Sequence, residues 1–426
     1  MLVLEPPPGH APTRKGWMDR RGGGVAASPT PRVALFTDTI ADVNGVSRFV
    51  NALAAHAPER LHVLACTRLG SPARPNVHIS PPLYARPLPG YAAIDLAIPR
   101  PGALERLADA IAPDVVHVST PGPVGLIGRR YALRRGLPLV GTFHTDFPAY
   151  IERLLDDPVL TRLGEGVLRW FYAPFDLVIA RSPASVPSLR RAGIAGSRIA
   201  CLPPGVDADG FHPRHRDAGG TIWGSVGGVR GNSIKVLYVG RVSVEKNLPM
   251  LARLWARVRG ECVRRGHDAQ LVVVGGGPHL SAMRQTLAGH DACFAGFRHG
   301  GELATLYASS DMFVFPSTTD TLGQAVMEAQ ASGLAAIVSD LGGPGTIVEH
   351  DRTGLVLSTA CDDGWIEGLV RLITGSGERT AMGAAARARL APMTIRASVG
   401  RFLRLHAEAW QRHKPGRALA RGPACG

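Results

Sequence analysis

The sequence predicts an α/β protein built from two doubly wound domains, one in each half of the chain. Short apolar runs of strand length alternate with helical periods from Arg32 onward, and the same alternation restarts near Lys235. The apolar runs do not alternate strictly with polar residues, which is typical of parallel strands covered by helices on both faces. A chain of 426 residues is long enough for two such domains.

In the N-terminal half, the first buried strand is expected at residues 33–36, followed by a glycine-containing loop and a helix over residues 46–57. Further strands are expected at residues 62–66, 114–118, 138–143, 176–180 and 198–202. The preceding residues 1–30 are rich in Pro, Gly and Arg and lack the apolar segment of a signal peptide, so we expect a disordered tail there. The first domain is therefore predicted to span residues 31–206.

Residues 207–233 are rich in Gly, His, Arg and Ser, and we expect them to link the two domains. A second domain is predicted over residues 234–393. Its strands are expected at residues 235–239, 270–274, 293–295, 311–315 and 335–338, and its helices at residues 248–258, 302–308, 323–332 and 363–374. A C-terminal helix over residues 394–413, with apolar residues loosely on one side, is expected to be able to cross back to the first domain, and residues 414–426 to form a tail.

The composition limits the classes of partner and of compartment. A net charge of +14, carried almost entirely by arginine, favours anionic partners, but no nucleic-acid motif accompanies it. The six cysteines show no C-x-x-C pair and no His spacing, which argues against a zinc site and a disulfide framework and fits a reduced, cytoplasmic compartment. No run of 18 apolar residues is present, so no transmembrane helix is expected.

Function is expected in the loops that follow the strands, where α/β domains bind ligands. Gly45 lies between the first strand and its helix, where a glycine lets backbone N–H groups approach a phosphate or sugar oxygen. The loop lacks a G-x-G-x-x-G pattern, and Gly45 alone is also compatible with an ordinary turn. His144 ends a strand beside hydroxyl and carboxylate groups, where it either binds a ligand or is satisfied by local backbone.

Two further loops carry charged residues. Arg241 and Lys246 lie five residues apart in a loop that opens a helix, an arrangement that suits a diphosphate, although pairing with Glu245 in a solvated loop is the alternative. Asp320 follows a strand, and Glu328 lies eight residues later in an otherwise apolar helix, so both can accept hydrogen bonds from sugar hydroxyls. A hydrolase uses similar acids, but one loop acid and one helix-interior acid are poorly placed to flank a single glycosidic bond.

Taken in order, these four stretches resemble the retaining glycosyltransferases of family 4, whose GT-B fold consists of two Rossmann-like domains facing each other across a cleft. The resemblance covers about residues 32–413 and is strongest over residues 236–357. It rests on Gly-Arg…Glu-Lys-Asn, Val-Gly-Gly-Gly-Pro, Ala-Ser-Ser-Asp-Met-Phe-Val-Phe-Pro-Ser, the two acids eight residues apart, and Pro-Pro-Gly-Val-Asp at residues 203–207.

The resemblance implies a role for each candidate residue. Arg241 and Lys246 match the pair that binds the donor diphosphate, and Glu328 matches the acid that holds the donor ribose. Asp320 matches the acid that contacts the transferred sugar. Gly45 matches the loop glycine near the diphosphate and the acceptor, and His144 matches the histidine near the sugar. Leu322, Gly323 and Gln324 match the residues that give backbone contacts to the donor. Asp320 stands where the family more often has Glu, and Asn44-Gly45 where it usually has two glycines.

The resemblance also implies a reaction: a hexose, with mannose among the candidates, passes from a GDP- or UDP-linked sugar to a lipid or glycan hydroxyl without a metal ion. The segments Phe-His-Thr-Asp-Phe and Thr-Asp-Thr-Leu-Gly are most similar to lipid and phospholipid α-mannosyltransferases. A nucleotide-sugar epimerase and a non-catalytic nucleotide-sugar-binding module remain alternatives.

Arginines on helices of the first domain are candidates for contact with an anionic membrane, which would place the protein peripherally on the inner face of the cell membrane. Solvated helix faces are the alternative. These arginines are Arg129, Arg130, Arg134, Arg135, Arg190 and Arg191.

Overall fold

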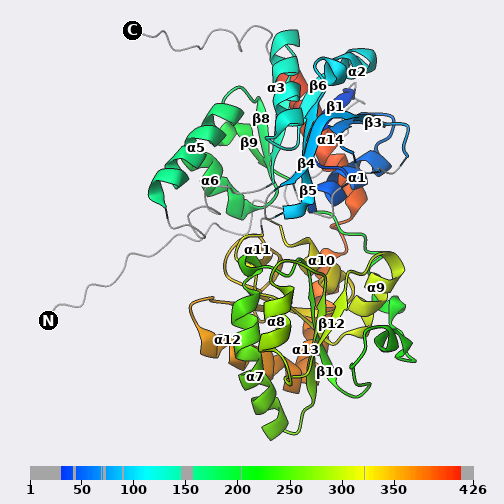
Figure 1. The fold of residues 1–426 in the computed structure, drawn as a ribbon, viewed down its shortest axis with the longest axis vertical. Helices are drawn as coiled ribbons and strands as arrows, with labels where there is room; N and C mark the ends of the chain where they lie inside the picture. The colour runs from blue at the N-terminus through cyan, green and yellow to red at the C-terminus, as the bar shows by residue number, and fades with distance from the viewer. Residues whose placement is uncertain are drawn as a thin grey trace, which may run out of the picture. The chain divides into compact units, whose positions relative to one another are not determined.

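The structure is a computed structural model that describes residues 30–41, 45–68, 70, 73–88, 91–144, 157–202, 204–320 and 322–413 (Figure 1). The tails expected at either end lie outside these residues, apart from Thr30. Within them, two parallel sheets form two Rossmann-like halves, which confirms the fold class predicted from the sequence.

The first half contains a seven-stranded sheet whose neighbouring strands are all parallel. In spatial order the strands are β3 (Val77–Ser80), β2 (Leu61–Cys66), β1 (Val33–Thr37), β6 (Val115–Val118), β7 (Leu139–Phe143), β8 (Leu177–Ala180) and β9 (Ile199–Cys201). The strand order reverses between β1 and β6, and ligands of open α/β sheets bind outside the carboxyl ends of strands at such a switch point.

Helices connect these strands. They are α1 (Gly45–His56), α2 (Ala103–Ile111), α3 (Pro123–Arg135), α5 (Pro158–Tyr172) and α6 (Val186–Arg191). An antiparallel hairpin of β4 (Pro82–Leu88) and β5 (Tyr91–Pro99) precedes α2 and was not predicted from the sequence.

The second half contains a six-stranded parallel sheet. Its spatial order is β12 (Ala292–Gly296), β11 (Ala269–Val274), β10 (Ile234–Val239), β13 (Met312–Phe315), β14 (Ala335–Ser339) and β15 (Gly354–Leu357). The order reverses between β10 and β13, which gives this half its own switch point. Its helices are α7 (Leu248–Arg264), α8 (Leu280–Thr286), α9 (Gly300–Ser309), α10 (Gln324–Ala331), α11 (Pro344–Ile347), α12 (Asp362–Thr374) and α13 (Ser376–Leu390).

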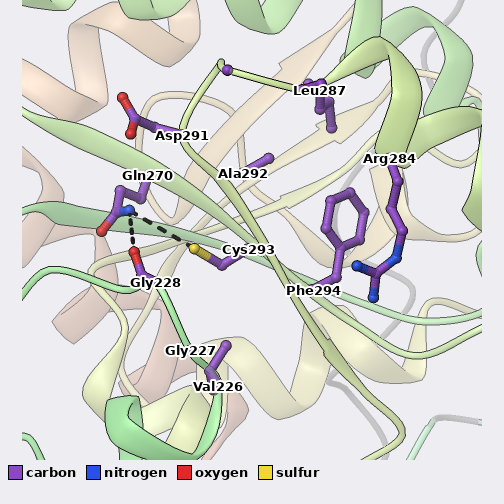
Figure 2. A pocket seen from close by; sticks show the side chains of 12 residues that line it. Val226, Gly227, Gly228, Gln270, Arg284, Leu287, Asp291, Ala292, Cys293 and Phe294 are labelled. Carbon is purple, nitrogen blue, oxygen red and sulfur yellow. Dashed lines mark hydrogen bonds between the residues drawn. The ribbon is translucent and has the colours of Figure 1, made fainter.

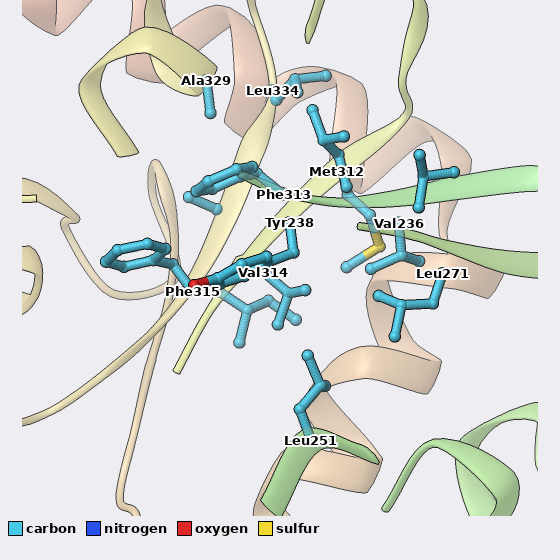
Figure 3. Close-up of a cluster of buried hydrophobic side chains, with 14 of the residues drawn as sticks. Val236, Tyr238, Leu251, Leu271, Met312, Phe313, Val314, Phe315, Ala329 and Leu334 are labelled. Atoms are coloured by element: carbon cyan, nitrogen blue, oxygen red, sulfur yellow. The ribbon is translucent and has the colours of Figure 1, made fainter. Parts of the chain in front are cut away.

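The central strands of the second half are fixed by a buried apolar core. Figure 3 shows side chains of β10, β11 and β13 lying together with residues of α7 and α10. Within it the rings of Tyr238 and Phe315 stack with centroids 5.8 Å apart. The segment expected to be a linker also joins this core, because Trp223 is 6% exposed and belongs to the same cluster.

The last helix, α14 (Ile395–Arg412), packs on the first sheet, as Figure 1 shows beside α1 and β1. Phe402 and Leu405 are almost fully buried in the cluster formed by β1, β2 and α1. His406 of the same helix is also buried, and its Nε2 atom lies 2.9 Å from Nδ1 of His117 on β6. The first sheet is therefore covered partly by residues near the start of the described chain and partly by residues near its end.

Candidate active site

The loop after β10 is brought close to the loop after β11 by glycines. Gly275 has φ +127°, and a Cβ atom there would lie 2.0 Å from the carbonyl oxygen of Gly240. A Cβ atom on Gly277 would lie 2.3 Å from the carbonyl oxygen of Val242. Only glycine permits this close backbone approach. The Val-Gly-Gly-Gly-Pro segment thus holds in place the loop that carries Arg241 and Lys246.

Lys246 and Asp320 meet at the switch point of the second sheet. Lys246 follows β10 and Asp320 follows β13, the two strands between which the order reverses. Lys246 Nζ lies 2.5 Å from Asp320 Oδ2, and the two side chains are 17% and 26% exposed. A cation and a carboxylate are therefore adjacent, and groups of these types can hydrogen-bond to a phosphate and to a hydroxyl, respectively. Arg241 is partly buried in the same loop.

Glu328 is fully buried in α10, yet it has two partners. Its Oε1 accepts a hydrogen bond from Arg48 Nη2 at 2.5 Å, and its Oε2 accepts one from the Tyr307 hydroxyl at 3.2 Å. Burial raises the pKa of Glu328, and the Arg48 guanidinium opposes that rise. Arg48 comes from α1 of the first half, so this ion pair joins α1 to α10.

Helix α10 begins at residues that the sequence predicts to contact the donor through their backbone. Gly323 precedes the helix with φ +79°, a conformation that favours glycine, and a Cβ atom there would lie 3.0 Å from Pro344 Cγ. Leu322 directly precedes it, and the side chain of Gln324 donates to the carbonyl oxygen of Gly205 at 3.4 Å. The positive end of the helix therefore lies in the same loop as Asp320.

In the first half, His144 lies directly after β7, and Thr145, Asp146 and Phe147 of the same motif lie outside the described residues. His144 Nε2 and Ser119 Oγ form a hydrogen bond of 3.1 Å. Burial, and secondarily the nearby Arg181 guanidinium, lower the pKa of His144 to about 3. The imidazole is therefore neutral at physiological pH, which suits hydrogen bonding to a sugar hydroxyl.

Gly45 is the first residue of α1, and a Cβ atom there would meet nothing within 4 Å. The local structure therefore does not itself require glycine, and Asn44 lies outside the described residues. One turn later α1 carries Arg48, which reaches Glu328, and Phe49, whose ring centroid lies 5.6 Å from that of His144. Helix α1 therefore contacts predicted residues of both halves, Glu328 through Arg48 and His144 through Phe49.

The structure brings Lys246 together with Asp320, and it places His144 against Ser119 and Phe49 of the first half. Sequence reasoning missed Arg48 and Tyr307. A buried acid in an apolar helix signals that a cation is needed. The identity of that cation was hidden because Arg48 and Glu328 are 280 residues apart.

A surface pocket of about 460 Å³ lies elsewhere on the second half, between β12 and the segment before β10 (Figure 2). Gln270 crosses it and donates to the carbonyl oxygen of Gly228 at 2.9 Å. Arg284 covers the ring of Phe294 at 4.7 Å. None of the predicted site residues lines this pocket, so it is distinct from the candidate active site.

Within the described ranges, no group of three or more His, Cys, Asp or Glu residues is arranged to hold a metal ion. In the same part of the chain, no helix is both long enough and apolar enough to cross a bilayer.

Comparisons with known proteins place this geometry in a family. A model described as "Glycosyltransferase Family 4" matches residues 43–209, and one described as "Glycosyl transferases group 1" matches residues 224–389. The chain is 32% identical to the GDP-mannose-dependent alpha-mannosyltransferase of Mycolicibacterium smegmatis over 366 residues, covering 84% of this chain and 92% of that protein. It is 30% identical to the sulfoquinovosyl transferase SQD2 of Arabidopsis thaliana over 270 residues, which span 63% of this chain but only about half (51%) of the plant protein.

Solved structures share the fold. The Anabaena protein Alr3699/HepE in complex with UDP and glucose has a TM-score of 0.69 at 16% identity, covering 89% of this chain and 100% of that one. Sucrose-phosphate synthase from Thermosynechococcus elongatus has a TM-score of 0.72 at 20% identity, covering 89% and 99%. At these identities the likeness concerns the GT-B fold alone.

The two parallel sheets and the solved structures that share them define the GT-B class of fold. The chain belongs to glycosyltransferase family 4. It is a hexosyltransferase that takes its sugar from a nucleotide-sugar donor and passes it to a glycan or lipid acceptor, which confirms the family and the class of reaction predicted from the sequence.

Proposed function

We propose that the enzyme transfers an α-mannosyl group from GDP-mannose to a hydroxyl of a lipid or glycan. Several relatives are named GDP-mannose-dependent alpha-mannosyltransferases, and one is named a GDP-mannose-dependent alpha-(1-6)-phosphatidylinositol dimannoside mannosyltransferase. The observation that carries the proposal is the Lys246–Asp320 pair at the β10–β13 switch point, in the loop that also opens α10.

In this proposal each group has one task. Arg241 and Lys246 neutralise the diphosphate together with the N-terminus of α10, so the reaction needs no metal ion. Asp320 accepts hydrogen bonds from the mannose, Leu322, Gly323 and Gln324 contribute backbone contacts, and Glu328 accepts them from the ribose. On the first half, His144 contacts the sugar and Gly45 lies near the diphosphate and the acceptor.

The chemical step follows from retention of configuration. The acceptor hydroxyl attacks the anomeric carbon from the same face as the one from which the leaving group departs. The new C–O bond forms as the bond to the diphosphate oxygen breaks. The hydroxyl proton passes to the departing phosphate oxygen, so nucleoside diphosphate and mannoside are the only products.

The first experiment is calorimetric binding of GDP, UDP and ADP with chelator present, followed by product analysis with GDP-mannose. We expect selective GDP binding and a new mannoside. Lys246→Ala is expected to weaken GDP binding more than tenfold, or by about 1.4 kcal/mol. Arg257→Ala, which removes an exposed cation from α7, is the matched control. Unchanged GDP binding in Lys246→Ala would contradict the site, and a free epimer as product would support the epimerase alternative.

We infer in addition that helix α5 brings the enzyme to an anionic lipid surface, where a lipid acceptor is presented. Four large apolar side chains on α5 are between 56% and 64% exposed, and their spacing of four, four and three residues puts them on one face: Val159, Leu163, Val167 and Trp170. An exposed apolar stripe with arginines beside it is typical of a helix that lies in a membrane interface.

The arginines expected to contact a membrane are not equivalent. Arg129 donates to the carbonyl oxygens of Trp170 and Phe171 and covers the Trp170 ring at 4.7 Å, so it fixes α3 to α5. Arg135 pairs with Asp109 at 2.7 Å. Arg130 is exposed on the same helix. This surface is basic and apolar together, which complements anionic lipid headgroups. A peripheral location on the inner membrane face is part of the same proposal.

A further inference from the structure

Among the residues that the structure describes, Arg181 is a buried cation with no anionic partner. It directly follows β8, is 4% exposed, and its Nη1 atom has no hydrogen-bond partner. The other buried Lys, Arg, Asp or Glu side chains of the described chain do have partners: Lys235 donates to Gly231, Arg379 to Leu372 and Ile373, and Glu328 is paired as described. Because burying an unpaired charge is unfavourable, Arg181 requires an explanation.

The strand register places Arg181 beside the proposed sugar site. Phe143 of β7 is the partner of Ala180 of β8, so the next residues, His144 and Arg181, leave neighbouring strands together. Both lie at the carboxyl edge of the sheet, where ligands of α/β folds bind. His144 is only partly buried, so this edge remains reachable.

The immediate neighbours of Arg181 hold it without neutralising it. Its Cζ atom lies 3.9 Å from the ring centroid of Phe49, a contact that orients the guanidinium but offers no hydrogen-bond acceptor. His144 is neutral and hydrogen-bonded to Ser119. Burial lowers the pKa of Arg181 to about 9, which leaves it charged at neutral pH. The result is a positioned guanidinium whose charge is not compensated in the described structure.

We propose that Arg181 binds an anionic oxygen group, a carboxylate, sulfonate or phosphate, that a substrate carries next to His144. A planar guanidinium recognises such groups through two parallel hydrogen bonds. Because mannose is neutral, the group belongs to the acceptor if GDP-mannose is the donor, and to the transferred sugar only if that sugar carries an acid at C6. The inference rests on the proposed function, because it takes His144 as the residue beside the sugar.

Calorimetry with paired probes distinguishes the two sources. In the donor arm, GDP-mannose is compared with GDP-mannuronate and UDP-glucose with UDP-glucuronate, which differ only at C6. In the acceptor arm, myo-inositol is compared with inositol 1-phosphate while the enzyme is saturated with nucleoside diphosphate. We expect the anionic member of at least one pair to bind at least tenfold more tightly.

Arg181→Gln is expected to abolish that preference while changing the affinity for the neutral member and for the nucleoside diphosphate by less than twofold. Arg106→Gln, which removes an exposed arginine from α2 of the same half, is the matched control. Because Arg181→Gln removes an unpaired buried charge, its melting temperature should not fall. Arg181→Met, of similar volume, replaces it if the glutamine variant fails to fold.

Three results would overturn the inference. The enzyme could show no preference in either arm, or the preference could survive in Arg181→Gln and Arg181→Met. Alternatively, these variants could lose as much affinity for the nucleoside diphosphate alone as for the anionic probe. The proposed function fails separately, because it is contradicted when the unmodified enzyme binds no nucleoside diphosphate. Nucleotide binding without discrimination in either arm contradicts only the role of Arg181.

Discussion

Glu328 shows how one residue can be identified from the sequence while its environment cannot. A functional role of its carboxylate is predicted because an acidic residue is unusual among apolar helix residues. The structure adds that Arg48 and Tyr307 occupy both carboxylate oxygens. A ribose that binds Glu328 must therefore replace one of these partners or share the carboxylate with it.

Glu328 is expected to make stability depend on pH in a defined direction. Burial raises its pKa in the folded enzyme above the ordinary value of about 4.5, so between these two values the folded state binds more protons than the unfolded state. The contribution of Glu328 to stability is therefore present below that window and is lost as the pH rises through it. The stability of the wild type relative to Glu328→Gln should fall over this range, as measured by urea unfolding.

The control for this measurement is Glu367→Gln, which changes an exposed glutamate on α12. A wild-type and a Glu328→Gln enzyme that change in parallel from pH 4.5 to 8 would refute the assignment. Arg48→Ala should raise the pKa of Glu328 further, because it removes the ion pair that opposes the rise. The loss of stability with rising pH should then extend to higher pH.

The other site residues were predictable to different degrees. Lys246 and Asp320 were found because each follows a strand, and the carboxyl ends of parallel strands share an edge. Arg181 also follows a strand, but a single arginine after an apolar run carries no distinguishing pattern. Its burial and missing partner are properties of the tertiary structure, as is the position of Phe49 against it.

At the scale of the element, α14 contributes part of the core of the first half. The sequence predicted the helix and an apolar side, and the structure shows what that side covers: Val399, Phe402, Leu405 and Ala409 belong to the core against β1 and α1. By contrast, the β4–β5 hairpin was not predicted. Its sequence is interrupted by prolines at Pro82, Pro87 and Pro99, which weakens any strand pattern.

Phe402→Ala tests how much α14 stabilises the first half. Phe402 is fully buried and packs on His117, with ring centroids 5.0 Å apart. Removing a buried phenylalanine side chain should lower the free energy of unfolding by about 3–5 kcal/mol, measured by urea denaturation. Arg404→Ala, at an exposed position of the same helix, should change it by less than about 0.5 kcal/mol. Equal effects of the two changes would show that α14 does not stabilise this core.

At the scale of the whole molecule, the order of elements was largely readable from the sequence. Restarting alternation predicted two sheets, and both have a strand order that reverses beside their first strand. The ends of most predicted strands agree with the structure to within one or two residues. Strands β3 and β15 were not predicted, and neither was the burial of Trp223, which joins the second core through contacts distant along the chain.

The net charge of +14 and the exposed face of α5 lead to a prediction about lipid vesicles. The enzyme should sediment with vesicles containing anionic phospholipid and not with neutral ones, and binding should weaken as salt screens the arginines. Val167→Glu should reduce binding at least fivefold, because it places a charge in the apolar stripe.

Val263→Glu provides the matched control for this prediction, since Val263 is 54% exposed on α7 whereas Val167 is 60% exposed on α5. Equal sedimentation of the two variants would remove α5 from the lipid-binding surface. Binding to neutral and anionic vesicles alike would show that the arginines do not contribute.

The return of α14 to the first sheet also has a consequence for synthesis on the ribosome. Strands β1 to β9 emerge early, yet one layer of their core waits for Phe402 and Leu405, which are translated some two hundred residues after β9 ends. Because nascent domains fold as they emerge, the second half can complete its own core first. During that interval the apolar face of the first sheet that Phe402 and Leu405 later cover is exposed to solvent.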